Sequence, residues 1–304
     1  MLRAFLLVVV WVCIASSPVR AQSLNVLATI KPLQLLVQEI GGEAVDVDLL
    51  IEPTQSAHDF QLRPSDLQRV DDADLVIWMG PALEHYLKKA LRKAPQAQAL
   101  YPKLDQGDDP HQWLEAEAVQ KMARKVARML SDRQPTRSAY FHSNAARFSS
   151  ELRQYDKALG DLLNRCDEKP YLFVHDGYGL FEARYNLTSG EAVMKDEGRL
   201  PGTRHMTELR QRLQAGEFVC VFSEPQFPQS VLGALMDGVE TPMVELDPMG
   251  IKVQADQGFM ALYRAIGDAF LNCVGTRETR AMMPTWIGGL GRSSLPGSRA
   301  ATSG

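Results

Sequence analysis

The chain has 304 residues, of which 45% are hydrophobic and 23% are charged, and its formal net charge is −4 at pH 7. This slightly acidic balance gives no electrostatic reason to bind nucleic acid or an anionic membrane surface, so we expect neither as a partner. The length is sufficient for two α/β lobes of ordinary size, each with its own hydrophobic core.

Residues 1–21 have the pattern of a secretory signal peptide. Arg3 precedes an apolar stretch over residues 4–14, and small residues lead to Ala21. The apolar stretch is too short to span a membrane, and the bulky residue before Cys13 argues against lipid attachment at that cysteine. We therefore predict a cleaved signal and an exported mature chain that is not inserted in the membrane.

Strand-like and helix-like stretches alternate through the first half of the mature chain, which is typical of a parallel sheet. We predict strands at residues 24–30, 45–51 and 74–79, and helices that begin at Lys31-Pro32, Arg63-Pro64 and Gly80-Pro81. After Gln134-Pro135, residues 136–166 lack proline and predict one long helix. At about 1.5 Å per residue this helix would span roughly 46 Å, more than a single lobe needs. We interpret it as the connection between two lobes.

The second half repeats the alternation. We predict strands at residues 171–174, 185–193, 218–222 and 243–246, and helices at residues 203–213, 226–236 and 259–273. The predicted domains are a signal peptide (1–21), an N-terminal lobe (22–134), a linking helix (135–166), a C-terminal lobe (167–274) and a disordered tail (275–304). The fold class is α/β, with two lobes that each contain a four-stranded parallel sheet.

Three histidines and one aspartate follow strands or enter loops. His58 ends a loop rich in Pro, Ser and Thr, His111 follows a short acidic stretch, and His175 and Asp247 each follow a predicted strand. Ligands of open α/β sheets bind beyond the carboxyl ends of the strands, so these four residues are candidate ligands. Three imidazoles with a carboxylate or water suit tetrahedral zinc. From spacing alone, the alternative is a set of scattered histidines with structural hydrogen bonds.

Three cysteines remain after the signal is removed, an odd number for an oxidising compartment. Cys220 lies in a strand-like stretch and Cys273 ends a helix-like one, so we predict a disulfide between them. A loop of this length would stabilise the fold by about 4 kcal/mol. Cys166 has acidic neighbours that raise a thiol pKa, so we expect it to be inert.

The residues around the candidate ligands form six motifs in a fixed order. They are His58-Asp59-Phe60 with Arg63-Pro64-Ser65-Asp66, Trp78-Met79-Gly80-Pro81, Pro110-His111-Gln112-Trp113-Leu114, Val174-His175-Asp176-Gly177-Tyr178, Ser223-Glu224-Pro225-Gln226-Phe227, and Leu246-Asp247-Pro248-Met249-Gly250. In this order they resemble the periplasmic zinc-binding (ZnuA-type) component of a bacterial ABC importer, in the cluster A-I family. The resemblance covers residues 24–273, nearly all of the mature chain.

The resemblance implies two lobes joined by one rigid helix, with a metal bound in the cleft between them. It places the zinc ligands on His58, His111 and His175, an optional carboxylate ligand on Asp247, and the disulfide on Cys220 and Cys273. It also implies a monomer in the periplasm that carries one Zn²⁺ per chain to a membrane permease and is not an enzyme. Glu224 is expected to be a hydrogen-bonded acid that braces the cleft.

One departure from the family lies before the second candidate ligand. Many members carry a long loop rich in His and Asp before the second ligand, whereas residues 101–109 are short and contain no histidine.

Two other functions remain as alternatives to zinc uptake. Manganese or iron carriers on this fold place a carboxylate where this chain has His175, and oxygen-rich sites suit manganese better. A three-histidine zinc hydrolase would need a general base and a substrate pocket, and no motif indicates either.

Overall fold

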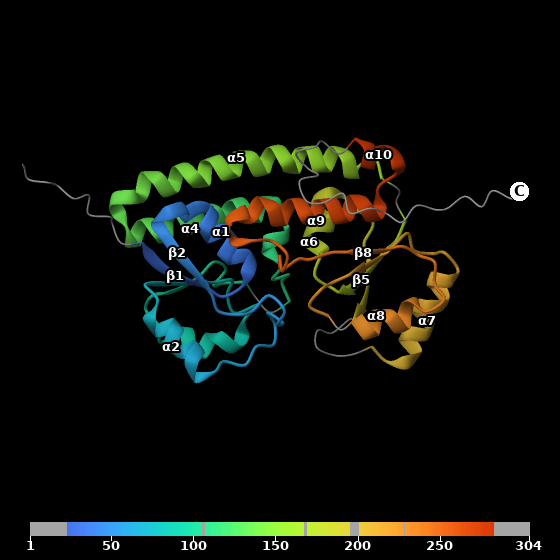
Figure 1. The fold of residues 1–304 in the computed structure, drawn as a ribbon, viewed down its shortest axis with the longest axis horizontal. Coiled ribbons are helices and arrows are strands. Elements are labelled where there is room, and N and C mark those ends of the chain that lie inside the picture. Colours follow the sequence, from blue (N-terminus) through green and yellow to red (C-terminus); the bar gives the residue numbers. More distant parts are fainter. Residues whose placement is uncertain (1–22, 105–106, 167–168, 195–200, 228, 283–304) are drawn as a thin grey trace, which may run out of the picture.

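The computed structural model describes residues 23–104, 107–166, 169–194, 201–227 and 229–282. The predicted signal peptide and most of the predicted tail lie outside these ranges. Two sheets, each of four parallel strands, form two lobes side by side (Figure 1). The first sheet has the order β2-β1-β3-β4, with β1 (Leu24–Ala28), β2 (Val45–Leu49), β3 (Leu75–Trp78) and β4 (Ala97–Ala99). The second has the order β6-β5-β7-β8, with β5 (Leu172–His175), β6 (Glu191–Met194), β7 (Val221–Ser223) and β8 (Met243–Glu245).

Helices cover the faces of both sheets. The α-helices are α1 (Lys31–Gly41), α2 (Pro64–Asp72), α3 (Lys88–Leu91), α4 (Ala116–Arg133), α5 (Ser138–Leu163), α6 (Gly179–Tyr185), α7 (Thr203–Gln214), α8 (Gln229–Met236), α9 (Gly258–Val274) and α10 (Arg277–Ala281). The 3₁₀ turns are η1 (Gly42–Ala44), η2 (His85–Leu87), η3 (Gln112–Leu114), η4 (Pro135–Arg137) and η5 (Ala255–Gln257). No helix in the described ranges is long and apolar enough to cross a lipid bilayer.

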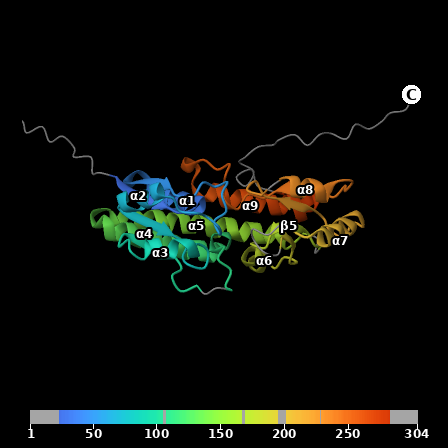
Figure 2. The same ribbon diagram turned by 90° about the horizontal axis from the view of Figure 1, so that it is seen from below.

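The long helix α5 runs along both lobes, as Figure 1 and the turned view in Figure 2 agree. It has 26 residues, which corresponds to about 39 Å. It starts two residues later than predicted, because Pro135 begins a 3₁₀ turn before it, and it ends at Leu163, three residues before the predicted end. The prediction of two parallel four-stranded sheets with one long connecting helix is therefore confirmed.

The main hydrophobic core is continuous between the lobes. A single cluster extends from Leu24 in β1, through Phe148 in α5, to Phe222 in β7 and Phe270 in α9. A smaller cluster, which includes Leu172, lies on the face of the second sheet that α7 and α8 cover. The prediction of a separate core in each lobe is wrong for the main cluster, because α5 and α9 pack against both lobes. This shared core restricts how far one lobe can move relative to the other.

Some predicted elements differ from the structure. Residue 185 ends helix α6 instead of starting a strand, and only residues 191–194 pair with β5 as strand β6. The stretch after Gly80-Pro81 forms turns before the short helix α3. The start of the predicted disordered tail contains helix α10, which Thr276 caps by accepting a hydrogen bond from the Thr279 amide. These segments are short, so tertiary contacts override their local preferences.

Cys220 and Cys273 form the predicted disulfide, with a Cα–Cα distance of 5.6 Å that is ordinary for such a bond. It connects the start of β7 to the end of α9. The Cys166 thiol lies 3.4 Å from the Leu162 carbonyl oxygen and is half-buried.

Candidate metal centre

His58, His111 and His175 line one pocket between the two lobes. Each comes from a different loop or strand end: His58 from the loop after β2, His111 from the residue before η3, and His175 from the last position of β5. The carboxyl ends of the strands of both sheets face this pocket, which explains why residues distant in sequence meet there. The convergence that the motif positions predict is therefore present in the fold.

The imidazole rings are in close contact. The Nε2 atoms of His58 and His111 are 3.1 Å apart, and the ring centroids of His111 and His175 are 5.5 Å apart. Two nitrogen ligands on a tetrahedral zinc ion are about 3.3 Å apart, given Zn–N bonds of about 2.0–2.1 Å. Among the residues described, no group of three or more His, Cys, Asp or Glu side chains already has the spacing to hold a metal ion. Small side-chain shifts are needed before all three rings can bind one ion.

The pocket is small. Its cavity volume is about 40 Å³, whereas pockets for organic ligands are usually about 300–1,000 Å³. Its walls include the apolar side chains of Trp113, Phe227 and Met249. A larger hollow of about 320 Å³ lies along β1, β2 and α2, away from the histidines. The histidine pocket has room for an ion and a water molecule but not for a metabolite.

Asp109 orients the His111 ring. Its Oδ1 atom lies 2.8 Å from His111 Nδ1 and accepts a second hydrogen bond, at 2.9 Å, from the His111 amide. Burial alone would raise the Asp109 pKa, but the hydrogen bonds and charge of His111 outweigh it, so the pKa is lowered. An ionised carboxylate can only accept, so Nδ1 carries the proton and Nε2 presents its lone pair to the pocket.

Glu224 holds the His175 ring in the same way. Its Oε1 atom lies 2.9 Å from His175 Nδ1. Its Oε2 atom accepts a hydrogen bond, at 2.9 Å, from Nε2 of the Gln226 side chain. The Glu224 side chain is fully buried. Burial raises its pKa, and the charge and hydrogen bond of His175 act against that shift. The expectation that Glu224 is a hydrogen-bonded acid at the cleft is confirmed.

His58 is positioned differently from the other two histidines, through hydrogen bonds to the backbone of its loop. Its loop is fixed by Tyr86, whose hydroxyl donates to the Ala57 carbonyl oxygen at 2.8 Å, and by Ser56, whose hydroxyl accepts from the His58 amide at 3.1 Å. His58 is half-buried, whereas His111 and His175 are each only 5% exposed. Of the three rings, His58 is therefore the most accessible to solvent.

Gly177 leaves space beside the rings. A Cβ atom at this position would lie 2.5 Å from His175 Nε2 and 3.2 Å from His111 Cε1. The backbone that follows β5 therefore closes directly over the point where the two rings meet.

The structure does not place Asp247 on the pocket wall. Its Oδ1 atom accepts a hydrogen bond from the Gly250 amide at 2.8 Å, and Oδ2 accepts from the Lys252 amide at 3.3 Å. Burial raises its pKa. The next two residues, Pro248 and Met249, do line the pocket. Asp247 thus stabilises the turn that forms this wall, and a role as fourth ligand stays a prediction.

Asp109 is a site residue that the sequence pattern did not indicate. It lies in a short acidic stretch and resembles a solvated linker residue. The signal was its position two residues before a candidate ligand, where an aspartate side chain can hydrogen-bond back to the chain.

Two parallel four-stranded sheets, joined by a long helix and enclosing a small histidine pocket, define a two-lobed solute-binding protein of the metal-binding kind. The chain matches the family described as "Zinc-uptake complex component A periplasmic" over residues 26–273, and it belongs to that family. It is similar to the "High-affinity zinc uptake system protein ZnuA" of Haemophilus ducreyi, with 28% identity over 288 residues, 82% of this chain and 93% of the relative. It is also similar to the protein of the same description from Yersinia pestis, with 27% identity over 299 residues, 85% of this chain and 94% of the relative.

Solved structures support the fold. A crystal structure of ZnuA superposes with a TM-score of 0.70 at 21% identity, covering 82% of this chain and 99% of that one. The Zn(II)-bound ZnuA-like domain of Streptococcus pneumoniae AdcA superposes with a TM-score of 0.72 at 18% identity, covering 84% of this chain and 100% of that one.

Proposed function

We propose that this chain binds one Zn²⁺ ion in the periplasm through His58, His111 and His175, and delivers it as a monomer to the membrane permease of an ABC importer. The observation that carries the proposal is the pocket itself. Three imidazoles from distant segments meet in about 40 Å³, and the Nδ1 atoms of two of them lie within hydrogen-bond distance of the carboxyl groups of Asp109 and Glu224. Family membership, through the matched residues 26–273, supports the role in uptake and the permease as partner.

The donor set favours zinc over manganese. Imidazole nitrogens suit zinc, whereas carboxylate oxygens suit manganese. The pocket does have carboxylates nearby, but Asp109 and Glu224 contact the Nδ1 atoms of the histidines, on the far side of each ring from Nε2. They therefore increase the basicity of nitrogen ligands and do not add oxygen ligands. This arrangement argues against the manganese or iron carrier as the alternative function.

The pocket also argues against a zinc hydrolase. A hydrolytic site needs an open position at the metal, space for the substrate and a general base. The cavity of about 40 Å³ has no space for an organic substrate. Glu224, the most buried acid beside the histidines, is already bonded to His175 and Gln226. Binding and release of an ion is the chemistry that this geometry supports.

Competition titration against a chelator tests the proposal. The wild-type chain should take up one zinc per chain and bind zinc much more tightly than manganese, while His111→Ala should lose most of the affinity. His142→Ala is the matched control, because His142 is exposed on α5, and it should bind as wild type does. His175→Glu should narrow the gap between zinc and manganese mainly by weakening zinc. Equal affinity of the wild type for both metals would refute the proposal.

A further inference from the structure

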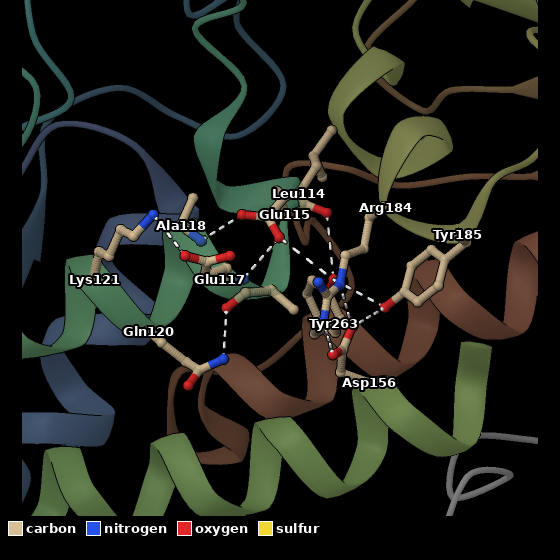
Figure 3. Close-up of polar contacts among 11 residues, drawn as sticks. Leu114, Glu115, Glu117, Ala118, Gln120, Lys121, Asp156, Arg184, Tyr185 and Tyr263 are labelled. Carbon is tan, nitrogen blue, oxygen red and sulfur yellow. Dashed lines mark hydrogen bonds and ion pairs between the residues drawn. The ribbon is translucent and has the colours of Figure 1, made fainter. Parts of the chain in front are cut away.

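A polar cluster lies where the two lobes meet α5; Asp156, Tyr185 and Tyr263 in it are buried, whereas Arg184 covers it from the solvent side with its side chain 36% exposed. We call it the Asp156 cluster, and Figure 3 shows its side chains pointing toward one another. Its members are Glu115, before α4 of the first lobe; Asp156, on α5; Arg184 and Tyr185, at the end of α6 of the second lobe; and Tyr263, on α9.

Asp156 is the acceptor at the centre of this cluster. It is 6% exposed, and Arg184 binds both of its oxygens: Nε donates to Oδ1 at 3.0 Å, and Nη2 donates to Oδ2. The Tyr185 hydroxyl donates to the same Oδ1 at 3.0 Å. A two-pronged pair of this kind fixes direction as well as distance. The end of α6 is therefore held to α5 in one orientation.

The same residues also contact the segment that follows His111. Arg184 Nε lies 3.9 Å from Glu115 Oε1, and Glu115 caps α4 by accepting from the Glu117 and Ala118 amides. The Tyr263 hydroxyl lies 3.2 Å from the Tyr185 hydroxyl and donates to the Leu114 carbonyl oxygen at 3.4 Å.

A third contact to this segment comes from the second lobe. The Trp113 indole donates to the Pro248 carbonyl oxygen at 3.0 Å, and this bond is buried. The residues directly after His111 thus belong to the first lobe in sequence, but residues of α6, α9 and the Pro248 turn hold them in space.

Helix α6 connects the Asp156 cluster to His175. Helix α6 begins at Gly179, four residues after His175, and it ends at the residues that bind Asp156. The cluster therefore connects the His111 segment to the His175 segment through one short helix. The shared hydrophobic core around α5 and α9 gives this connection a rigid base.

We propose that Arg184, acting with Asp156 and Tyr263, is a positioning residue of the metal site. It touches no metal; it holds the His111 segment and the His175 segment at one separation, so that both rings can reach the same ion. This inference rests on the proposed zinc-binding function. Without the guanidinium, the two segments fluctuate relative to each other, and the bound state must order them. Zinc should then dissociate faster and bind about 2- to 30-fold more weakly.

Zinc dissociation rates and competition constants of three variants test this role. Arg184→Met keeps most of the side-chain volume, but it removes the charge and the two-pronged hydrogen bonding of the guanidinium. Arg184→Lys keeps the charge without the two-pronged geometry, so it should keep part of the affinity that Arg184→Met loses. Arg212→Met is the matched control, because Arg212 also binds two carboxylates, Glu191 and Glu217, but within the second lobe. It should release zinc at the wild-type rate.

The outcomes separate this inference from the function beneath it. If the wild type does not bind zinc, the proposed function fails and this role fails with it. If the wild type binds zinc and Arg184→Met releases it at the wild-type rate, only the positioning role is overturned. Equal acceleration in Arg184→Met and Arg212→Met would also overturn it, because the effect would then be general. If Arg184→Met does not fold, Tyr263→Phe removes a single hydroxyl of the cluster: faster release supports the role, and unchanged release refutes it.

Discussion

The side chains of His175, the last residue of β5, and Glu224, the residue directly after β7, meet at 2.9 Å because the two strands are neighbours in the sheet. Leu172 of β5 pairs with Val221 of β7, and each of the two polar residues lies three positions further along the chain. The strand register therefore places a carboxylate beside an imidazole at the end of the sheet. A carboxylate on Nδ1 fixes the ring orientation and makes Nε2 a better ligand.

Glu224→Gln should weaken zinc binding by about tenfold. The amide oxygen can still accept from His175 Nδ1, but it lacks the negative charge that increases the basicity of the ring. Stability without zinc should not fall, because burial already raises the Glu224 pKa and so disfavours the ionised form. Chelator competition and thermal unfolding measure the two effects.

Glu182→Gln is the control for that substitution. Glu182 is another buried acid of the second lobe, but it binds the Tyr171 hydroxyl and the Gly190 amide. Its replacement should leave zinc affinity unchanged. Wild-type affinity in Glu224→Gln would remove Glu224 from the metal site.

Asp247→Ala should weaken zinc binding less than alanine at any of the three histidines. The Asp247 carboxylate binds backbone amides of residues 250 and 252 and does not line the pocket, and water can take a fourth position on zinc. Titration of the four alanine variants side by side measures the order. An Asp247 variant as weak as the histidine variants would show that the carboxylate reaches the ion when zinc binds.

Replacing both cysteines of the disulfide, Cys220→Ala with Cys273→Ala, should lower the free energy of unfolding by about 4 kcal/mol. Zinc affinity should change little, because Cys220 precedes β7 and Glu224 follows it, so the bond is at the opposite end of the strand. Urea unfolding measures the loss. Cys166→Ala, which leaves the disulfide intact, is the control. A loss of zinc binding equal to that of a histidine variant would mean that the bond shapes the pocket.

The sequence predicted the parts of this fold that have strong local patterns. Short apolar stretches at β1, β3 and β5 are buried on both faces, and runs of this kind indicate parallel strands. Ligand residues after such strands converge because the carboxyl ends of parallel strands lie at one edge. Strand position made His175 a candidate ligand, and the resemblance of the surrounding motifs to the zinc-binding family was needed to single out all three histidines.

Other features depend on tertiary contacts that leave no local pattern. Strand β4 is only Ala97–Ala99, and its pairing with β3 defines it. The sequence pattern does not predict helix α6, because the glycines and aromatic residues at its start resemble a turn. Arg184 and Asp156 are 28 positions apart, and Tyr263 contacts Leu114 over 149 positions. Neither pair has a spacing that indicates contact, so the Asp156 cluster follows only from the packed structure.

The raised pKa of the buried Glu84 side chain predicts how the stability of the fold depends on pH. Its side chain is fully buried, and its Oε2 atom accepts from the Met79 amide at 2.8 Å. Burial raises its pKa from 4.5 to about 7. Between these values the folded chain holds a proton that the unfolded chain releases, so stability falls as pH rises from about 4.5 to about 7. Below this window both states are protonated and the effect disappears; above it the loss is complete, on the order of 3 kcal/mol.

Glu84→Gln should remove this slope, since the amide is neutral at every pH and can accept from the same backbone amide. Urea unfolding from pH 4 to pH 8 should give equal stability for wild type and variant at the acid end, and a more stable variant above about pH 7. Other titrating groups contribute equally to both chains and cancel in the difference. Glu43→Gln, at an exposed position, should give no such pH-dependent gap. A constant difference between Glu84→Gln and wild type, or one that widens toward acid pH, would contradict a raised pKa at Glu84.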